Sequence, residues 1–519
     1  MEINRVSNRS CHRPKRTILI KGAILLFVVL LSAQGVLCQS ADAVRGYVRE
    51  HQQQIAKEYL TYLSIPNLHG DIPNLSRNAD LLMTMLEKRN LAPELWKTSG
   101  APIVFGQKIV PGAQRTLLFY IHYDGQPVDL KRWKQPDPFV PVVRTESIEK
   151  GGQVVTDITA TQSIPDQWRI YARAAGDDKV PIEALLVALD ALGGKTKQNI
   201  KVILHGEEEG SGPSLDEVVR KYPDKLKSDL LIILDGPQHP SGKPTIYYGA
   251  RGGAGLDLTV YTAAGGMHSG NYGNWMPDAN VRLAQLLSSM VSSTGKVVID
   301  GFYSDVLPFS PAAVKMMQAV PDDSKQMQLN YGVGSLDGAA SSLQEGLNLP
   351  TFSVHMMKGG EVGGVIPATS SAQIAMRLVK ENDPGVMVQR VIDHIRKQGY
   401  FVVTADPDLQ TLATHSRIVK ITSRSLNGAR GSGAWRTDPD DPQAVFATKA
   451  LEATAEHGLI RIRTLGGGVP ASTFIDAYHV PTVGISIANY DDNQHTDNEN
   501  LRFGNLWDGV VTLAGLLTQ

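Results

Sequence analysis

Four apolar runs in this sequence lead into residues of the types that bind metal ions. Three of them are followed at once by such residues: His122, the three carboxylates after His205, and Asp235. The fourth leads into a polar loop that contains His495. Short uncharged runs of this kind are typical of buried strands. Because the carboxyl ends of parallel strands lie at one edge of a sheet, we expect these side chains to gather in one crevice.

The most informative of these stretches spans residues 204–212, where Glu207, Glu208 and Glu209 follow one another within a glycine-rich turn. Three carboxylates at the end of a buried strand are unfavourable unless a positive charge neutralises them. An acidic surface loop is the simplest interpretation of such a run taken alone. The other strand ends, together with Asp177 just before a predicted helix at 181–192, favour a shared site instead. Imidazoles and carboxylates without thiolates suit zinc, manganese or cobalt in an open catalytic site.

The first 40 residues differ from the remainder of the chain. Several Arg and Lys side chains precede the uncharged stretch 22–37, which is typical of a secretory signal peptide. We expect cleavage and a secreted or periplasmic protein, with anchoring in a membrane by an uncleaved segment as the alternative. Both cysteines, Cys11 and Cys38, lie in this segment. The part after Cys38 therefore has no disulfide, catalytic thiol or thiolate metal ligand.

The 519-residue chain has 42% apolar and 20% charged residues, as expected of a globular protein with two or three domains. Its formal net charge of −1 gives no field of one sign for nucleic acid or an anionic membrane surface. Alternating strand and helix patterns up to residue 234 predict a parallel sheet with right-handed crossovers. The order of elements after residue 249 predicts a ferredoxin-like sandwich whose last strand is 401–404.

We therefore predict an α/β fold, a mostly parallel sheet flanked by helices, with an inserted ferredoxin-like α+β domain. The predicted division is 1–40 for the signal segment, 41–248 and 436–519 for the two parts of the first domain, and 249–435 for the inserted domain. An insertion at 293–347 has no predicted role. Helices are expected at 42–63 and 78–90. Glu207 is interpreted as the surface member of the acidic run, and His205 and His239 as surface or turn residues.

Five motifs together resemble a zinc exopeptidase family that includes carnosine and cytosolic nonspecific dipeptidases, aminoacylase, carboxypeptidase G and succinyl-diaminopimelate desuccinylase. They are His122-Tyr123-Asp124-Gly125-Gln126-Pro127, Gly176-Asp177-Asp178-Lys179, Glu208-Glu209, Gly265-Gly266-Met267-His268-Ser269-Gly270 and His495-Thr496-Asp497-Asn498-Glu499. The similarity covers most of residues 42–519. Each motif is weak alone, whereas all five together are highly specific. The resemblance implies the zinc exopeptidase fold, with the inserted domain serving as a lid and dimerisation domain.

The resemblance also implies two divalent metal ions per chain, zinc in the first instance and manganese or cobalt as alternatives. In this assignment His122 and Asp235 bind one ion, Glu209 and His495 bind the other, and Asp177 bridges them. Two such ions clamp a nucleophilic hydroxide and polarise a carbonyl group. Asp124 would orient His122 by accepting its second ring N–H.

Further residues are assigned to catalysis and substrate binding by the same resemblance. Glu208 would be the general base acting on the metal-bridging hydroxide, and His268 of the lid would steady the oxyanion. Arg377 would hold the substrate carboxylate in a pocket lined by the backbone of Gly467 and Gly468. His268 is distant in sequence from every predicted ligand, so the lid must close over the site or come from a partner subunit.

The implied activity is hydrolysis of a peptide bond near a free C-terminus in dipeptides or short peptides, of dipeptidase or carboxypeptidase type. Removal of an N-acyl group from an amino acid is the alternative, since the same attack serves both reactions. A catalytically inactive binding protein is disfavoured because the predicted ligands and Glu208 are all present. Alanines replace the usual glycines at Ala172 and Ala174, which leaves the substrate preference open. A homodimer formed through the lid domain is expected.

Overall fold

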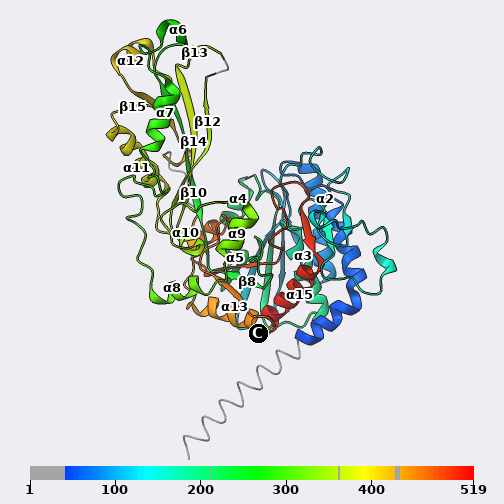
Figure 1. Cartoon of the computed structure of the whole chain (residues 1–519). Helices are drawn as coiled ribbons and strands as arrows, with labels where there is room; N and C mark the ends of the chain where they lie inside the picture. Colours follow the sequence, from blue (N-terminus) through cyan, green and yellow to red (C-terminus); the bar gives the residue numbers. More distant parts are fainter. Residues whose placement is uncertain (1–40, 211, 361–362, 427–432) are drawn as a thin grey trace, which may run out of the picture.

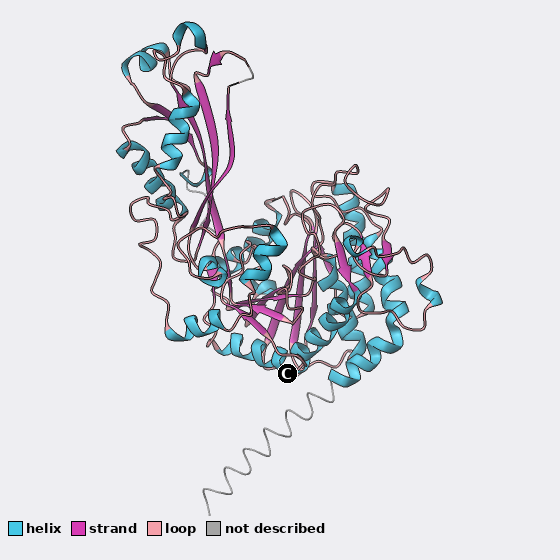
Figure 2. Ribbon diagram, in the orientation of Figure 1, coloured by secondary structure: helices cyan, strands magenta, loops and turns pink. Residues whose placement is uncertain are grey.

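Two sheets dominate the fold. The computed structural model describes residues 41–210, 212–360, 363–426 and 433–519, so the predicted signal segment lies outside the described residues. One sheet has eight strands in the order β1-β2-β6-β3-β7-β19-β8-β18, and another has five in the order β12-β14-β10-β16-β15. The large sheet lies in the body of the molecule, and the five-stranded sheet lies in an arm that projects from it (Figure 1, Figure 2).

The large sheet consists of short, mostly apolar strands. They are β1 (Glu94–Trp96), β2 (Ile103–Lys108), β3 (Thr116–His122), β6 (Asn199–His205), β7 (Leu230–Ile233), β8 (Thr245–Tyr247), β18 (Ile460–Ile462) and β19 (Thr482–Ser486). The central strands β6, β3, β7 and β19 are parallel to one another. They are buried almost throughout, as strands covered on both faces must be. The predicted mostly parallel sheet is confirmed.

Helices cover both faces of this sheet. One apolar cluster on the first face contains residues from several helices. They are the helix over residues 41–63, α2 (Ile72–Lys88), α3 (Lys179–Ala191), α13 (Pro442–Glu452) and α15 (Phe503–Thr518). On the other face, α4 (Ser214–Lys221), α5 (Pro223–Leu226) and α14 (Ser472–Tyr478) contribute to a second cluster. Helix α2 starts earlier than predicted because Asp71 accepts the backbone N–H of Asn74 and caps it there.

The arm contains β10 (Gly252–Tyr261), β12 (Thr351–Gly359), β14 (Thr369–Leu378), β15 (Phe401–Val403) and β16 (Ile418–Thr422), packed against α7 (Ala279–Ser288) and α11 (Pro384–Lys397). The order β12-β14-β10-β16 is that of a ferredoxin-like sheet. The prediction was wrong about its last strand, because β16 pairs with β10 and β15 lies outside it. Strand β16 buries Ile418, Val419 and Ile421, whereas Phe401 of β15 is exposed. Burial of apolar side chains therefore favours β16 as the neighbour of β10, with β15 at the edge of the sheet.

The chain enters and leaves the arm side by side. Strand β9 (Gly249–Ala250) pairs with β17 (Trp435–Arg436) in antiparallel fashion, at the positions where the domain boundaries were predicted. These boundaries remain a prediction, to which the pairing lends support. The insertion at 293–347 forms α8 (Pro311–Gln318), α9 (Ser324–Tyr331) and α10 (Leu343–Leu347). Val320 joins the apolar cluster of α4, so part of the insertion packs against the body.

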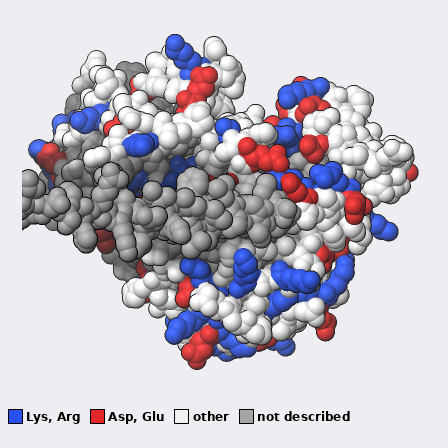
Figure 3. Space-filling model, turned by 90° about the horizontal axis from the view of Figure 1, so that it is seen from below, with Lys and Arg blue, Asp and Glu red and all other residues white. Residues whose placement is uncertain are grey.

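A small sheet ties the segment before Asp177 to the C-terminal part of the chain. It has the order β20-β5-β4, with β4 (Val142–Arg144), β5 (Arg169–Tyr171) and β20 (Asn500–Arg502). It therefore places the loop of Asp177 beside the loop of His495. On the face seen from below, Lys and Arg are interspersed with Asp and Glu among the described residues (Figure 3).

Candidate metal centre

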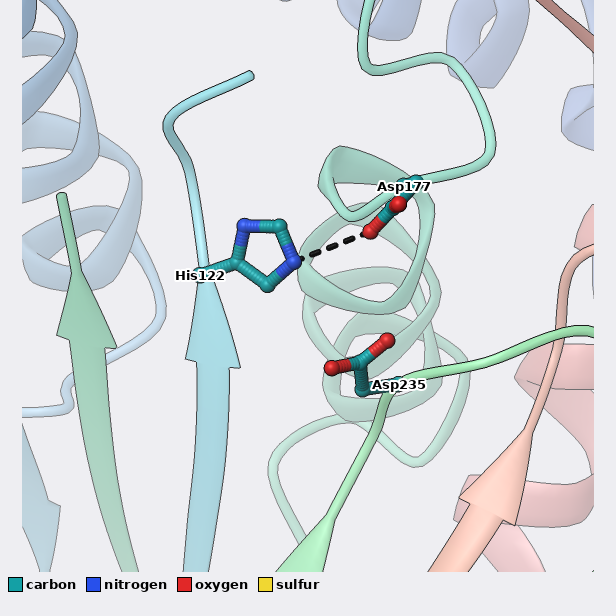
Figure 4. Close-up of side chains that lie close together, drawn as sticks. All are labelled: His122, Asp177 and Asp235. Atoms are coloured by element: carbon teal, nitrogen blue, oxygen red, sulfur yellow. Dashed lines mark hydrogen bonds and ion pairs between the residues drawn. The ribbon is translucent and has the colours of Figure 1, made fainter. Parts of the chain in front are cut away.

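The structure brings the five predicted metal ligands together at the carboxyl edge of the large sheet. His122 is the last residue of β3, Glu209 follows β6, and Asp235 follows β7. Asp177 lies just before α3, and His495 lies in the loop between β19 and β20. Figure 4 shows the side chains of His122, Asp177 and Asp235 turned toward one another from two strand ends and the start of a helix.

These side chains form two groups that share one carboxylate. His122, Asp177 and Asp235 make one group, and Asp177, Glu209 and His495 make the other, with ligand atoms within 4.8 Å of one another in each. Asp177 Oδ1 lies 2.9 Å from His122 Nε2, and Asp177 Oδ2 lies 3.0 Å from His495 Nε2. The two oxygens of Asp177 thus face different imidazoles, which is the arrangement a bridging carboxylate needs.

The electrostatics of the cluster suit a cation. Burial, with the nearby charges of Asp235 and Glu209, raises the pKa of Glu208 to about 8. Burial and the charge of Asp177 raise the pKa of Glu209 to about 7 and that of Asp235 to about 6. Burial would also raise the pKa of Asp177, but the imidazoles of His122 and His495 lower it. Crowded carboxylates that resist ionisation here would be neutralised by divalent ions, and the oxygen and nitrogen donor set fits them.

Asp124 is fully buried and connects two parts of the centre. Its Oδ1 lies 3.4 Å from His122 Nδ1, where it can accept the second ring N–H. The same carboxylate accepts the backbone N–H groups of Glu208 and Glu209, each at 3.1 Å. Asp124 therefore braces the His122 ring and the acidic turn at once, which extends the orienting role suggested by the resemblance.

Glu499 has a positioning role that the sequence did not reveal. Its carboxylate is fully buried and pairs with Arg173 at 2.8 Å. It also accepts the backbone N–H groups of Ala174, Gly176 and Asp177, each at 2.9 Å. Glu499 thereby joins the loop of Asp177 to the loop of His495. The signal was present in the motif that begins at His495, whose last residue is Glu499.

Three expectations about nearby residues were wrong. Glu207 is buried rather than a surface residue, because its carboxylate packs against Gly100 and Gly212, which have no side chains. His205 is buried between the Tyr120 hydroxyl and Ser214 Oγ, at 2.8 and 3.0 Å. His239 is buried and pairs with Asp322 of the insertion at 3.1 Å. In each case contacts with residues from other parts of the chain bury a polar side chain.

A cavity of about 370 Å³ lies beside the metal centre. Glu208, Arg377 and Gly468 line it, so it contains the predicted base, the predicted carboxylate anchor and part of the glycine-rich loop. Gly467 is exposed in the same loop, and its carbonyl accepts the backbone N–H of Arg251 at 3.2 Å. A guanidinium and a carboxylate that belongs to neither ligand group thus lie in one cavity.

His268 is not brought to this cavity within the chain. It is exposed and pairs with Val365 of β13 (Val365–Ile366), next to α6 (Ser269–Tyr272). Both α6 and β13 lie at the end of the arm farthest from the large sheet (Figure 1). The residue predicted to steady the oxyanion therefore belongs to a different region from the other predicted site residues.

Comparison with known proteins agrees with the predicted family and with the fold. The family described as Peptidase family M20/M25/M40 matches residues 118–519. Human Beta-Ala-His dipeptidase is 25% identical over 80% of this chain and 77% of its own length. The Cys-Gly metallodipeptidase dug1 of Schizosaccharomyces pombe is 23% identical over 91% of this chain and 96% of its own. The M20 family metallo-carboxypeptidase Sso-CP2 of Sulfolobus solfataricus has the same fold, with a TM-score of 0.70 and 24% identity over 89% of this chain and 98% of its own.

The chain belongs to peptidase family M20/M25/M40, and it is a metallopeptidase of the dipeptidase type. The predicted family is thus confirmed. The predicted location, secreted or periplasmic with membrane anchoring as the alternative, is contradicted by the likeness to Cys-Gly and Beta-Ala-His dipeptidases. Among the described residues, no helix is long and apolar enough to cross a membrane. A basic segment followed by a short apolar run is a pattern of composition only, and it lies outside the described residues.

Proposed function

We propose that this metallopeptidase removes the C-terminal residue from dipeptides and short peptides by hydrolysis at the shared-carboxylate centre. The observation that carries the proposal is the pair of ligand groups joined at Asp177, beside a cavity with Glu208 and Arg377. The two similar dipeptidases support a peptide rather than an N-acyl amino acid as substrate. When bound, two divalent ions would polarise the scissile carbonyl and lower the pKa of the attacking water.

Five residues would hold the ions, and one carboxylate remains for proton transfer. His122 and Asp235 would bind one ion and Glu209 and His495 the other, with Asp177 between them. Glu208 belongs to neither ligand group, yet it lines the adjacent cavity. Its carboxylate would take a proton from the attacking water and deliver it to the leaving amine. Asp124 holds the backbone of both Glu208 and Glu209, so the two carboxylates have fixed and different surroundings.

The substrate would be held by its free carboxylate. Arg377 lines the cavity and is exposed there, and its guanidinium can form two parallel hydrogen bonds to a carboxylate. Gly467 and Gly468 leave the backbone open beside it. A substrate anchored in this way would present the peptide bond before its last residue to Glu208, which explains an exopeptidase rather than an endopeptidase.

The oxyanion donor would come from a second copy of the chain. His268 lies at the far end of the arm, while β12 is the last strand of the arm sheet and most of its residues are exposed. An exposed edge strand is a surface on which another strand can pair. A homodimer formed through the arms would cover this edge and carry each His268 toward the site of the partner.

The test is a comparison of two neighbouring isosteric changes. Glu208→Gln should lower kcat by roughly 10²- to 10⁴-fold while the protein still binds two divalent ions, as measured by elemental analysis. Glu207→Gln, which makes the same chemical change one residue away, should leave kcat within a few-fold. Glu209→Gln should lose one of the two ions. An active Glu208→Gln with an inactive Glu207→Gln would place the base one residue earlier and contradict the assignment.

A further inference from the structure

A second and larger cavity lies next to the cavity that contains Glu208. It has a volume of about 510 Å³ and lies between the insertion and the start of β12. Its lining is rich in apolar and aromatic side chains, among them Tyr303, Met327, Tyr331, Leu336, Leu347 and Phe352. None of the predicted metal ligands lines it, so it is distinct from the metal centre.

The two cavities adjoin at Arg251, which lines both of them. The sheet register places them side by side as well. Arg377 pairs with Gly253 on one neighbouring strand and with Thr351 on the other, so the three share one face of the sheet. Gly253 and Arg377 line the cavity of Glu208, and Thr351 lines the apolar cavity. The apolar cavity therefore begins directly beside the proposed carboxylate anchor.

Arg251 forms the wall between the cavities together with the glycine-rich loop. Its Nε donates to the carbonyl of Gly466 at 3.1 Å, and its backbone N–H donates to the carbonyls of Leu465 and Gly467 at 3.2 Å. A side chain at position 466 would come within 3.0 Å of Leu347 Cδ2, which lines the apolar cavity. The glycine at this position thus leaves the space between the loop and the apolar cavity open.

Several apolar side chains that line this cavity are far more exposed than apolar side chains of a packed core. Tyr331 is 75% exposed and Leu336 is 66% exposed, although both line the cavity. A concave apolar surface beside an active site is a common feature of ligand subsites. The carboxylate and the side chain of an amino acid leave the same Cα atom, so a pocket beside the carboxylate anchor is within reach of that side chain.

We propose that the apolar cavity receives the side chain of the substrate's C-terminal residue, and that it selects for large apolar or aromatic residues there. The proposal rests on the proposed function, because it takes Arg377 as the anchor of the free carboxylate. It assigns a role to the insertion at 293–347: α9, α10 and the loop between them form the wall of a specificity pocket.

The test fills the cavity and measures the choice of C-terminal residue. Ala340 lines the cavity and is partly exposed, so Ala340→Trp would occupy it without removing a side-chain hydrogen bond. Wild-type protein loaded with divalent metal should cleave Ala-Phe and Ala-Leu with kcat/KM on the order of tenfold or more above that for Ala-Gly. Ala340→Trp should remove this preference and leave the rate on Ala-Gly within a few-fold. Ala312→Trp, on the exposed side of α8, is the matched control and should keep the preference.

A second variant and a binding measurement guard against a folding defect and against failure of the proposed function. Leu336→Asp changes an exposed side chain at the cavity and should also remove the preference for Ala-Phe. Calorimetry on metal-free protein should show tighter binding of phenylalanine than of glycine, and Ala340→Trp should abolish the difference. If wild type cleaves no dipeptide but keeps this binding preference, the proposed function fails and the pocket stands. Unchanged preferences in both variants, or a preference for Ala-Asp over Ala-Phe in wild type, would overturn the proposal.

Discussion

The carboxyl edge of the large sheet and the end of the arm both carry predicted site residues, but they differ in how far they are preformed. At the sheet edge, His122, Asp124 and Asp177 are buried and held by hydrogen bonds before any ligand arrives. At the end of the arm, His268 is exposed, and its ring accepts only the backbone N–H of Gly270 among the hydrogen bonds of the described residues. Trp275 nearby is 74% exposed.

Under the proposed function, this difference would separate a fixed catalytic part from a part that a second copy of the chain completes. Ligands of a metal pair must be positioned closely, which buried strand ends and carboxylate braces provide. A group that only stabilises the developing oxyanion can arrive from a mobile or separate element, provided that it docks reproducibly. The predictions below test each side of this division, from the largest expected effect to the smallest.

The largest effect should come from the shared carboxylate. Asp177→Asn keeps the shape of the side chain but weakens both ligand groups, because Asp177 belongs to each. Both ions should be lost, and activity should fall below detection, as it should after treatment of wild type with a chelator. Elemental analysis and a peptidase assay would measure these losses. Asp393→Asn, on the exposed surface of α11, is the control and should change neither quantity. Retention of one ion in Asp177→Asn would show that the two groups do not depend on a bridge.

The sequence was sufficient to predict the sheet edge but not the details that support it. Apolar runs that end in His122, Asp235 and the acidic turn predicted both the strands and the cluster, because parallel strands bring their carboxyl ends together. The brace by Glu499 depends on a contact with Arg173 more than 300 residues earlier in the chain, at 2.8 Å. No local pattern records such a contact. The burial of Glu207 likewise depends on Gly100, which lies on a distant loop.

In the arm, the sequence predicted the domain type and misplaced one strand. The alternating strands and two helices were sufficient for a ferredoxin-like order. Whether β15 or β16 pairs with β10 depends on how each strand packs there, which periodicity does not encode. The insertion at 293–347 was recognised only as extra length. Its helix α9 shows little apolar periodicity, and the packing of the insertion against the body depends on contacts such as that of His239 with Asp322.

The second prediction concerns the oxyanion donor. His268→Ala should lower kcat by roughly 10²- to 10³-fold and leave the metal content unchanged, since removal of one such donor costs about 2.7–4 kcal/mol. If the partner supplies this residue, unfolding and refolding an equal mixture of His268→Ala and Glu208→Gln should restore activity. Hybrid dimers would contain one complete site, so roughly a quarter of wild-type activity per chain is expected for random pairing. No recovery in a dimer verified by sedimentation would show that His268 acts within its own chain or not at all.

The third prediction concerns the carboxylate anchor at the junction of the two regions. Wild type should cleave a dipeptide with a free C-terminus roughly 10- to 100-fold better in kcat/KM than its C-terminal amide, because charged hydrogen bonds contribute about 1.5–3 kcal/mol. Arg377→Ala should lose most of this discrimination through a higher KM for the free acid. Arg396→Ala, an exposed position on α11, is the control. Equal rates on the acid and the amide in wild type would count against Arg377 as the anchor.

The smallest effect should come from His205, a buried histidine that is not one of the predicted metal ligands. Burial lowers the pKa of His205 to about 4, whereas an unfolded chain holds a histidine near its ordinary value of about 6.5. Between these values the unfolded state binds more protons than the folded state, so the free energy of unfolding should fall as the pH drops from about 6.5 toward 4. His205→Gln, measured by urea unfolding at pH 7.5 and 5.5, should show a pH dependence weaker by about 1 kcal/mol than wild type. His457→Gln, at an exposed position, should keep the wild-type slope. An unchanged slope in His205→Gln would mean that the ring is not held neutral by its burial against Tyr120 and Ser214.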